Sequence, residues 1–517
     1  MTMSPLGVDS ATVQPMDEFN QTLVSAVHPS DWINPTPADC YDLVVIGAGT
    51  AGLVSAAGAA GLQLGLRVAL IEKHLMGGDC LNVGCVPSKC IIRSAKLVGE
   101  LQRGQSLGID VANPVQVDFA AAMARMRQVR AGISHHDSAQ RFRDLGIDVF
   151  FGTGSFCDRQ TIAVAGQRLR FKKAVIATGA RAAHPNIPGL QEVGYLTNET
   201  LFSLTTRPQR LAVIGGGPIG CELAQAFRRL GSEVVMLHRG ERLLPKGDPE
   251  AAALIASVFQ QEGIQLEFDA HLERVEATVA GKRLHYRCNG NLQSVTVDEI
   301  LVGVGRAPNV EGMNLEAAGI TYDPTHGICV NDFLQTTNSR VYGAGDICMD
   351  WKFTHAADAA ARLILKNMFF SPFGLGRLRL SQLVMPSVTF TDPEIAQVGL
   401  TATAAAQQGT AIRTITIPLD QVDRAIIDDE ALGFVQIHHS PGSDQILGAT
   451  VVARHGGEIL TQLTAAMVGK VGLNKLSGVI HPYPTQSEGI KKAADAYRRA
   501  LLTPRTRALL RVLTKLS

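Results

Sequence analysis

Short apolar runs that end in glycine recur along this sequence and predict buried strands that lead into tight turns. The run "YDLVVIGAGTAG" begins at Tyr41, and "RLAVIGGGPIGCELA" repeats its pattern 168 residues later. In both copies an apolar segment follows the glycines, so we expect a strand, a turn and a buried helix, the arrangement that holds a dinucleotide. The glycines of the first copy are Gly47, Gly49 and Gly52, and those of the second are Gly215, Gly217 and Gly220.

Three further apolar runs end in glycine and are expected to return to the two sheets. They are "KAVIATGA" (173–180), "ILVGVGRAPN" (300–309) and "VYGAGDI" (341–347). From about residue 380 the pattern changes to alternating strands such as "GFVQIHH" and "ILGATVVA", followed by a helical stretch near 458–470. We therefore predict an α/β fold with two Rossmann-like dinucleotide-binding domains and a C-terminal α+β domain.

The predicted boundaries divide the 517 residues into six segments. An N-terminal extension (1–39) precedes the first part of the first nucleotide-binding domain (40–190), the second nucleotide-binding domain (191–310), the second part of the first (311–380), the α+β domain (381–490) and a helical tail (491–517). The extension has no sustained period and is expected to pack on a domain or to stay mobile. The tail is broken at Pro504 and interleaves leucines with Arg505, Arg507, Arg511 and Lys515.

Composition argues against several classes of protein. The net charge is +1, which gives no electrostatic reason to expect a nucleic-acid partner. The stretch from Leu43 to Leu66 has no charge and imitates a membrane span, but it contains six glycines and is expected to fold inside the first domain. No signal peptide is expected, because the amino end lacks a basic segment followed by an apolar run. Nine cysteines in a chain of this length indicate neither a disulfide scaffold nor a zinc site and fit a cytoplasmic protein.

The residue after the second strand differs between the two nucleotide units. In the first unit Glu72 ends "RVALIEK", 20 residues after the last glycine, where its carboxylate can accept from both ribose hydroxyls of an adenosine, as in FAD. In the second unit His238 stands 18 residues after the last glycine, with Arg239 and Arg242 close by. Arginine binds a 2′-phosphate that a glutamate would repel, so we predict NADPH rather than NADH. The alternative is that the arginines are ordinary surface residues of a loop.

Two cysteines in "GGDCLNVGCVPSK" indicate redox chemistry. Four residues separate Cys80 from Cys85, too many for a two-residue zinc knuckle. A helical start would bring positions i and i+5 close enough to form a disulfide, so we predict a redox-active pair.

These motifs together make the chain similar, from about residue 40 to 500, to the flavin-dependent pyridine nucleotide-disulfide oxidoreductases. This is the family of dihydrolipoamide dehydrogenase, glutathione reductase and mercuric reductase. The resemblance rests on the two glycine fingerprints, the "CLNVGCVPSK" box, "ATG", "GAGDI" and "PSVTFTDPEIAQVGLT" (386–401). It implies FAD and NADPH as cofactors, and a C-terminal domain that makes the protein a homodimer with shared active sites.

The resemblance also implies roles for single residues. Cys85 would be the thiolate that stacks on the flavin and forms the charge-transfer complex, and Cys80 the outward thiol that meets substrate. Lys89 would approach flavin N5 and pair with Glu222, just beyond the second glycine motif. Further FAD contacts are implied for Gly78, Gly179, Asp346 and Thr354, and NADPH contacts for Glu222 and Gly305.

Two positions close to the redox pair fit this pattern less directly. Asp79 stands where relatives usually have Thr, which leaves its role open. Cys90 is interpreted as a small buried apolar residue, because the family uses only two cysteines here.

The segment "HPYPTQSEG" (481–489) discriminates between members of this family. Disulfide reductases use a His, paired with a Glu five residues later, as the general acid and base across the subunit interface. Here Glu488 is present but Tyr483 takes the His position, and a phenol with a pKa of about 10 is a poor base. Mercuric reductases have Tyr at this place, and a soft ion such as Hg(II) binds two thiolates strongly. We therefore predict reduction of Hg(II) to Hg(0) by NADPH, with the metal held transiently by Cys80 and Cys85.

Two features depart from mercuric reductases and leave other acceptors open. The chain ends "LLRVLTKLS" without a vicinal cysteine pair, and the extension has no C-x-x-C motif, since Cys40 stands alone. A second hypothesis keeps the electron path but replaces the metal by a disulfide, a quinone or another small oxidant, as in a dihydrolipoamide dehydrogenase. A third is a regulatory flavoprotein that contacts a membrane surface through its basic, leucine-rich tail, although such helices more often pack on a dimer or stay solvated.

Overall fold

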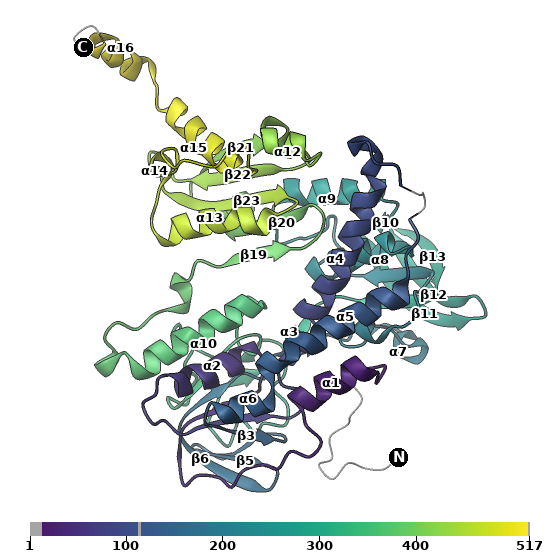
Figure 1. Ribbon diagram of the computed structural model, residues 1–517, viewed down its shortest axis with the longest axis vertical. Coiled ribbons are helices and arrows are strands. Elements are labelled where there is room, and N and C mark those ends of the chain that lie inside the picture. Colours follow the sequence, from purple (N-terminus) through teal and green to yellow (C-terminus); the bar gives the residue numbers. More distant parts are fainter. Residues whose placement is uncertain (1–12, 112–114, 515–517) are drawn as a thin grey trace.

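The computed structural model describes residues 13–111 and 115–514, which form three layered units (Figure 1). The strands of the first unit are β1 (Tyr41–Ile46), β2 (Val68–Glu72), β3 (Ile147–Phe151), β4 (Ser155–Asp158), β5 (Thr161–Val164), β6 (Gln167–Ile176) and β18 (Val341–Gly343). β1 pairs in parallel with β2 and with the C-terminal half of β6, while β3 and β18 extend the sheet on either side. The N-terminal half of β6 pairs with the antiparallel hairpin of β4 and β5. The sheet around β1 is the first of the two nucleotide-binding sheets that the sequence predicted.

Burial on both faces explains the apolar sequence of β1. Leu43 and Val45 face a core that includes α2 (Thr50–Gly61) and α10 (Thr354–Phe369), whereas Val44 and Ile46 face a second core. A parallel strand covered on both sides shows no polar alternation. The uncharged stretch that imitates a membrane span therefore folds as a strand, a turn and a buried helix, as predicted.

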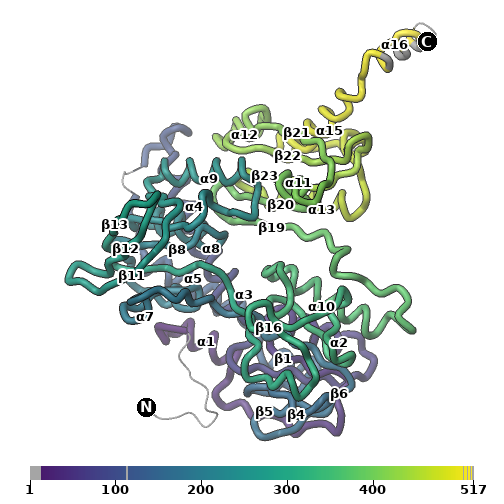
Figure 2. The backbone as a smooth tube through the Cα atoms, turned by 180° about the vertical axis from the view of Figure 1, so that it is seen from behind, coloured from purple at the N-terminus to yellow at the C-terminus, as the bar shows by residue number. Residues whose placement is uncertain are grey.

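The second unit repeats the strand, turn and helix of the first. Its elements are β8 (Arg210–Ile214), α8 (Pro218–Arg229), β9 (Glu233–Leu237), α9 (Pro249–Gln261), β10 (Gln265–Glu267) and β14 (Glu299–Val302). The four strands are parallel in the order β10-β9-β8-β14. An antiparallel meander of β11 (Ala270–Thr278), β12 (Gly281–Cys288) and β13 (Asn291–Val297) lies at the outer side of this unit (Figure 2). The predicted internal repeat is confirmed.

The third unit is an antiparallel sheet in the order β19-β20-β23-β22-β21. Its strands are β19 (Pro386–Thr389), β20 (Glu394–Gly399), β21 (Arg413–Pro418), β22 (Phe434–His439) and β23 (Ile446–Ala453), and its long helices are α13 (Gly456–Val468) and α15 (Glu488–Ala500). Along β23, Val451 faces these helices and Val452 faces the core of the second unit. The sheet therefore has one face under helices and the other against the nucleotide-binding half, which confirms the predicted α+β class.

The N-terminal extension contains a helix that its sequence pattern did not predict. α1 (Glu18–Val27) begins after Asp17, whose side chain accepts from the amide of Asn20. It packs on α5 (Phe119–Ile133) and buries Leu23 and Val27 fully. Of the two expectations for the extension, packing on a domain is the one observed for residues 13–39, and residues 1–12 lie outside the described residues.

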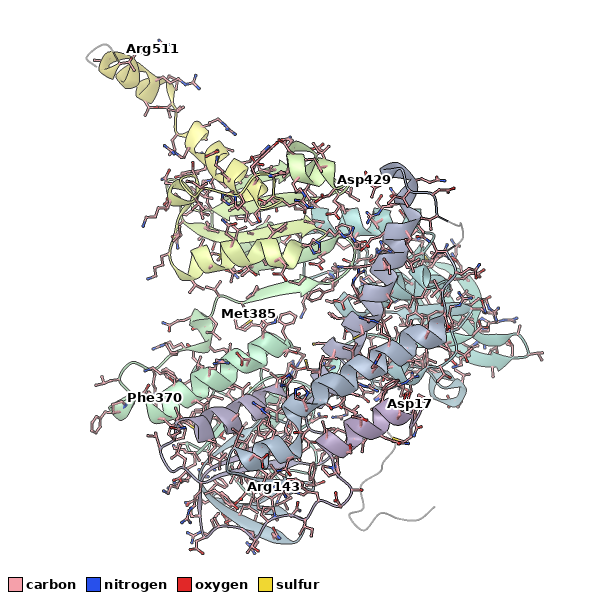
Figure 3. All side chains as sticks on the ribbon, in the orientation of Figure 1. Asp17, Arg143, Phe370, Met385, Asp429 and Arg511 are labelled. Carbon is pink, nitrogen blue, oxygen red and sulfur yellow. The ribbon has the colours of Figure 1, made fainter. Side chains whose placement is uncertain are left out.

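The tail continues as α15 and then α16 (Pro504–Leu513), which begins at the predicted break. α16 projects away from the three units, with Arg511 near its end (Figure 3). Lys515 lies outside the described residues. Within residues 13–111 and 115–514, no helix is both long and apolar enough to cross a membrane.

The shorter elements are α6 (Ala139–Asp144), α7 (Leu190–Val193), α11 (Ala402–Gln407), α12 (Asp423–Ile427), α14 (Leu473–Leu476), β7 (Ala180–Ala182), β15 (Arg306–Pro308), β16 (Tyr322–Asp323) and β17 (Gly327–Ile328).

Candidate active site

The segment with the two predicted redox cysteines folds as two consecutive helical starts. Cys80 lies in α3 (Gly78–Asn82), and Cys85 is the first residue of α4 (Cys85–Gln102). Gly84 stands between the helices, and a Cβ there would lie 2.7 Å from the carbonyl oxygen of Asp79. The single helical start expected from the sequence is therefore replaced by a break, across which the two cysteines meet.

The redox segment is packed directly on the first glycine turn. Gly78 has a φ of +56°, and a Cβ at this position would lie 2.7 Å from Cα of Gly49. Only glycine allows so close an approach in this left-handed conformation. The cysteines are thus held beside the turn that is expected to bind the FAD pyrophosphate.

Cys80 and Cys85 are both free thiols in this structure and interact with each other. The hydrogen bond from Cys80 is the main reason why the pKa of Cys85 falls to about 6, and Thr354 and Lys89 lower it further. Thr354 is the first residue of α10 and places its Oγ1 3.2 Å from the Sγ of Cys85. The hydrogen bond to Cys85, together with burial, raises the pKa of Cys80. The reduced pair therefore carries one thiolate, at Cys85, near neutral pH.

The contact with Thr354 gives a pH-dependent prediction. Replacing Thr354 by valine removes one hydrogen bond to the thiolate, so the pKa of Cys85 should rise from about 6 by roughly one pH unit, since such a bond contributes about 1.5 kcal/mol. The thiolate forms as the pH rises through this pKa, so the rate of alkylation of the reduced protein should increase at a higher pH in the variant. Thr354→Ser keeps the hydroxyl and serves as the control. An unchanged midpoint in Thr354→Val would contradict the assigned contact.

Lys89 and Glu222 form the ion pair that was predicted, and they connect the three units. Lys89 Nζ lies 2.7 Å from one carboxylate oxygen of Glu222, and the other oxygen accepts from the amide of Phe390 at 2.9 Å. The Lys89 ammonium also lies 4.5 Å from the centre of the Phe390 ring. Glu222 is only 6% exposed, so this cation is held in place by a buried partner on α8.

The residues around the first glycine turn fit an FAD molecule. Glu72 ends β2, as predicted, and its two oxygens accept from the amides of Ala48 (2.7 Å) and His74 (2.8 Å). Burial raises the pKa of Glu72, and each oxygen keeps a lone pair for a ribose hydroxyl. A Cβ at Gly49 would find only Gly78 within 4 Å, and one at Gly179 would find nothing. A pyrophosphate can therefore approach the amides at the start of α2.

Asp346 and Asp79 share a partner that the sequence did not reveal. Arg306 donates from Nε to Asp346 at 3.1 Å, from Nη2 to the carbonyl oxygen of Ala180 at 2.6 Å, and forms an ion pair with Asp79. Burial by itself lowers the pKa of Arg306, because it disfavours the charged guanidinium. The two carboxylates outweigh this effect, so the pKa of Arg306 is raised overall. Asp79, whose role was left open, thus ties the redox segment to β15. The available signal was an arginine directly after the glycines of "VGVGR".

The second glycine turn has a different environment. His238 Nδ1 accepts from the amide of Gly216 at 3.1 Å, and burial lowers the pKa of the ring, so His238 is a neutral support of the turn. Arg242 donates to the carbonyl oxygens of Pro245 (2.9 Å) and Gly247 (3.3 Å). Arg239 is exposed and has no carboxylate partner in the part of the chain that the structure describes. Of the three predicted residues, Arg239 is the one with an uncommitted charge.

The glycines predicted to contact the pyridine nucleotide lie in the turn between β8 and α8 (Gly215 and Gly217), in the first turn of α8 (Gly220) and directly before β15 (Gly305). A Cβ at Gly220 would lie 2.1 Å from the carbonyl oxygen of Gly215, and a Cβ at Gly215 would lie 2.4 Å from that of Gly303, whereas a Cβ at Gly217 or Gly305 would find nothing within 4 Å. The open positions leave room for a phosphate at the start of α8.

Tyr483 and Glu488 lie far from the redox cysteines of the same chain. Tyr483 is 70% exposed, and its hydroxyl donates to Asp423 of α12 at 3.1 Å, which raises the pKa of the phenol. Glu488 is the first residue of α15. Both ring nitrogens of His481 have partners. Nε2 lies 2.9 Å from the side-chain amide nitrogen of Gln462, and Nδ1 lies 3.1 Å from the carbonyl oxygen of Val479. In both views α12 and α15 are far from α3 (Figures 1 and 2).

A pocket of about 390 Å³ opens between α4 and α5 beside Cys85, and we name it the α4–α5 pocket. Its lining contains Cys85, Cys90, Lys89, Arg93 and Arg125, with three aliphatic side chains. Cys90 is only partly buried, so the expectation of a buried apolar residue is wrong in its degree of burial. Sequence reasoning missed Arg93 and Arg125, because nothing in the order of residues shows that α5 packs beside α4.

No cluster of three His, Cys, Asp or Glu side chains that could hold a resident metal ion is found in the described ranges.

The fold and the cysteine pair define a flavoprotein disulfide oxidoreductase, and the chain belongs to the pyridine nucleotide-disulphide oxidoreductase family. The model of this family matches residues 41–361, and the model of its dimerisation domain matches residues 385–494. The family resemblance inferred from the motifs is thereby confirmed. The protein is an NAD(P)H-dependent oxidoreductase that uses FAD and a pyridine nucleotide, and its dimerisation domain supports a homodimer.

Individual relatives carry different names. The chain is 35% identical over 458 residues to a mercuric reductase of Staphylococcus aureus, covering 88% of this chain and 82% of the relative. It is 32% identical over 459 residues to a dihydrolipoyl dehydrogenase of Chlamydia muridarum, covering 87% of this chain and 95% of the relative. Among solved structures, the HOCl-induced flavoprotein disulfide reductase RclA of Escherichia coli superposes with a TM-score of 0.78 at 26% identity, covering 88% of this chain and 99% of RclA. RclA has also been solved as a Cu(II) complex.

Proposed function

We propose that this protein uses NADPH to reduce a thiolate-bound metal ion at the Cys80–Cys85 pair, with Hg(II) reduced to Hg(0). In the overall reaction NADPH loses two electrons and one proton, Hg(II) accepts both electrons, and the products are NADP⁺, a proton and Hg(0). Bound FAD supplies the chemistry that connects a hydride donor to a dithiol pair. The residues of the chain bind the nucleotides, stabilise one thiolate and hold the metal.

The observation that carries this proposal is the phenol of Tyr483 in the place of an imidazole base. Its proton is held by Asp423 and its pKa is raised, so it is a weak acceptor for the proton of an incoming thiol. A thiol-disulfide exchange needs such an acceptor, whereas a metal displaces thiol protons when it binds. The Cys85 thiolate provides one soft ligand near neutral pH, and Cys80 becomes the second ligand when its proton leaves.

Relatives with both chemistries support one leading and one alternative acceptor. The mercuric reductase of Staphylococcus aureus and the Cu(II) complex of RclA favour a metal ion. The dihydrolipoyl dehydrogenase relative and the name of RclA, a disulfide reductase, favour a disulfide. The exposed Tyr483 and the occupied nitrogens of His481 favour the metal over the disulfide in this chain.

The proposal is tested by anaerobic NADPH oxidation with Hg(II), lipoamide, glutathione disulfide and a quinone as acceptors. Hg(II)-dependent oxidation of NADPH with release of mercury vapour in equal amount is the expected result. No NADPH oxidation above the acceptor-free rate with Hg(II), together with rapid turnover of lipoamide that is lost in Tyr483→Phe, would establish the disulfide alternative instead.

We further propose NADPH rather than NADH, because Arg239 offers an uncommitted guanidinium where a 2′-phosphate would lie. Arg239→Glu should lower the ratio of kcat/KM for NADPH over NADH about tenfold to a hundredfold, since one charge-assisted hydrogen bond is lost and a repulsion is added. Arg168→Glu, an exposed position on β6, makes the same change of charge on another domain and should leave the ratio unchanged. A preference for NADH that Arg239→Glu does not alter would remove the assignment.

A shared active site and a cytoplasmic location belong to the same proposal. Tyr483 and Glu488 lie far from Cys80 of their own chain, so we infer that they act on the cysteines of the partner subunit in the homodimer. A monomer with full activity would contradict this inference. We propose a cytoplasmic location, because the proposed electron source, NADPH, is available there.

A further inference from the structure

The N-terminal extension reaches the redox segment through a buried arginine of α5. Arg130 is only 1% exposed, and both of its hydrogen-bond partners are neutral oxygens. Nη1 donates to the carbonyl oxygen of Asn82 at 2.5 Å, and Nη2 donates to the side-chain oxygen of Asn20 on α1 at 2.6 Å. Burial is the main reason why the pKa of Arg130 falls to about 10, so the guanidinium stays charged at neutral pH. One buried cation thus joins the extension to the helix that carries Cys80.

Asn82 is the last residue of α3 and connects both ends of this short helix. The last carbonyl groups of a helix have no partner inside it, and Arg130 supplies a donor to the carbonyl of Asn82. The side-chain amide of Asn82 donates to the carbonyl oxygens of Met76 at 3.1 Å and Gly78 at 2.9 Å. The position of Cys80, between Gly78 and Asn82, therefore depends on the contact with Arg130.

Further contacts fix α1 at both of its ends. At its start, Asp17 accepts from Nε of Arg127 at 2.6 Å, and Arg127 is itself buried on α5. At its end, the carbonyl oxygen of Val27 accepts from the amide of Met76 at 3.2 Å, in the chain that leads into α3. α1 lies along α5 over this length, with Asp17 at its start (Figures 1 and 3). The extension is therefore attached to the redox segment by its backbone as well as through Arg130.

We propose that α1 is part of the framework of the active site, and that Asn20 and Arg130 are positioning residues that hold the sulfur of Cys80 opposite that of Cys85. Two thiols that are already held together lose less conformational freedom when their sulfurs form a bond, so a fixed α3 favours the disulfide. This inference rests on the proposed redox role of Cys80 and Cys85, and it holds for any electron acceptor.

The test measures the thiol-disulfide equilibrium of this pair in the full-length, FAD-loaded protein. Oxidised dithiothreitol takes two electrons and two protons from the two thiols and becomes a dithiol, while the protein sulfurs form their bond. Equilibrated samples are alkylated, and the tryptic peptide of residues 74–89, which contains both cysteines, reports the fraction of disulfide.

Two variants should shift this equilibrium toward the dithiol. Arg130→Met removes the charged donor to α3 and should lower the equilibrium constant for disulfide formation about tenfold, equal to about 30 mV for a two-electron couple. Asn20→Leu leaves Arg130 with one of its two partners and should lower the constant about threefold. Asn20→Asp keeps an oxygen that accepts from Arg130, so its constant should stay within about twofold of that of the unmodified protein.

Asn34→Leu is the matched control in the same extension. Asn34 donates to the carbonyl oxygen of Phe151 at 2.9 Å and accepts from the amide of Phe151 at 2.8 Å, so it holds the extension to β3 and not to the redox segment. This variant should lower the thermal midpoint as Asn20→Leu does, but it should leave the equilibrium constant unchanged.

Hydrogen exchange gives a direct measure of the order of α3. The amide of Val83 donates to the carbonyl oxygen of Asp79 at 2.9 Å and closes the helical turn that contains Cys80. Exchange at this amide should be faster in Arg130→Met and Asn20→Leu than in the unmodified protein, and unchanged in Asn34→Leu.

Failure of the proposed function and failure of this inference give different results. If no disulfide between Cys80 and Cys85 forms at any ratio of oxidised to reduced dithiothreitol, the redox role is wrong and the inference falls with it. If the disulfide forms, but Asn20→Leu has the equilibrium constant of the unmodified protein, only the positioning role is overturned. The result for Asn20→Leu decides even if Arg130→Met does not fold. An equal shift in Asn34→Leu would also overturn the positioning role, because it would reflect a general loosening of the extension.

Discussion

Replacing Cys85 by serine is expected to lower metal-dependent and disulfide-dependent NADPH oxidation by about a thousandfold or more. The thiolate at Cys85 has a pKa of about 6 because Cys80, Thr354 and Lys89 stabilise its charge, and a serine hydroxyl in the same place does not ionise near neutral pH. Cys80→Ser should have an effect of similar size, because it removes the second ligand and the hydrogen bond that lowers the pKa of Cys85. The measurement is steady-state NADPH oxidation with each acceptor under anaerobic conditions.

Two comparisons show whether such a loss reflects the cysteine pair. Cys329→Ser changes an exposed cysteine of the central region and should leave all rates unchanged. Quinones, which take electrons without the help of the cysteines, should be reduced by Cys80→Ser and Cys85→Ser at the rate of the unmodified protein. Metal turnover that persists in both variants would show that the acceptor does not react at Cys80 and Cys85.

Gly52→Ala is expected to prevent assembly of the first nucleotide-binding domain. A Cβ at this position would lie 1.7 Å from the carbonyl oxygen of Gly47, an overlap with main-chain atoms that no side-chain movement can relieve. The cost is about 3 kcal/mol or more, because either the turn or the start of α2 has to move. Purified Gly52→Ala should contain little FAD and should have a lower thermal midpoint.

Gly49→Ala is the matched control in the same turn. A Cβ there would lie 3.7 Å from Cα of Gly78, an ordinary contact, so the folded structure should lose no more than about 1 kcal/mol. Because Gly49 leaves open space where a phosphate can approach, FAD affinity should still fall. Equal thermal midpoints for Gly52→Ala and the unmodified protein would contradict the close packing of this turn.

Local patterns were sufficient to predict the elements that bind nucleotides. The run before Gly47 is apolar without alternation because β1 is buried on both faces, and the same reason applies to the run before Gly215. Glu72 could be placed at the end of β2 by counting from the glycines, since the turn and helix of this unit have a nearly fixed length. The helical break at Pro504 follows from the missing amide of proline.

Patterns of this kind were not sufficient for residues whose role depends on a distant partner. α1 was not predicted because its buried face is short and is completed by contacts with α5, more than 90 residues later. His238 was predicted beside the 2′-phosphate, whereas its ring supports the amide of Gly216. The helical start that was expected to bring Cys80 and Cys85 together is interrupted, because Gly84 packs against the backbone of Asp79.

The sequence by itself determined the family, the two glycine turns, the identity of the redox cysteines and the presence of Tyr483 in place of a histidine, because each is written within a stretch of a few residues. Only the tertiary structure showed which neighbours lower the pKa of Cys85, which partner Asp79 and Asp346 share, and that Arg93 and Arg125 meet beside Cys85. The physical reason is that charge and acidity depend on what lies within a few ångströms. In this protein those neighbours, such as Thr354 for Cys85 and Arg306 for Asp79, come from parts of the chain more than 200 residues away.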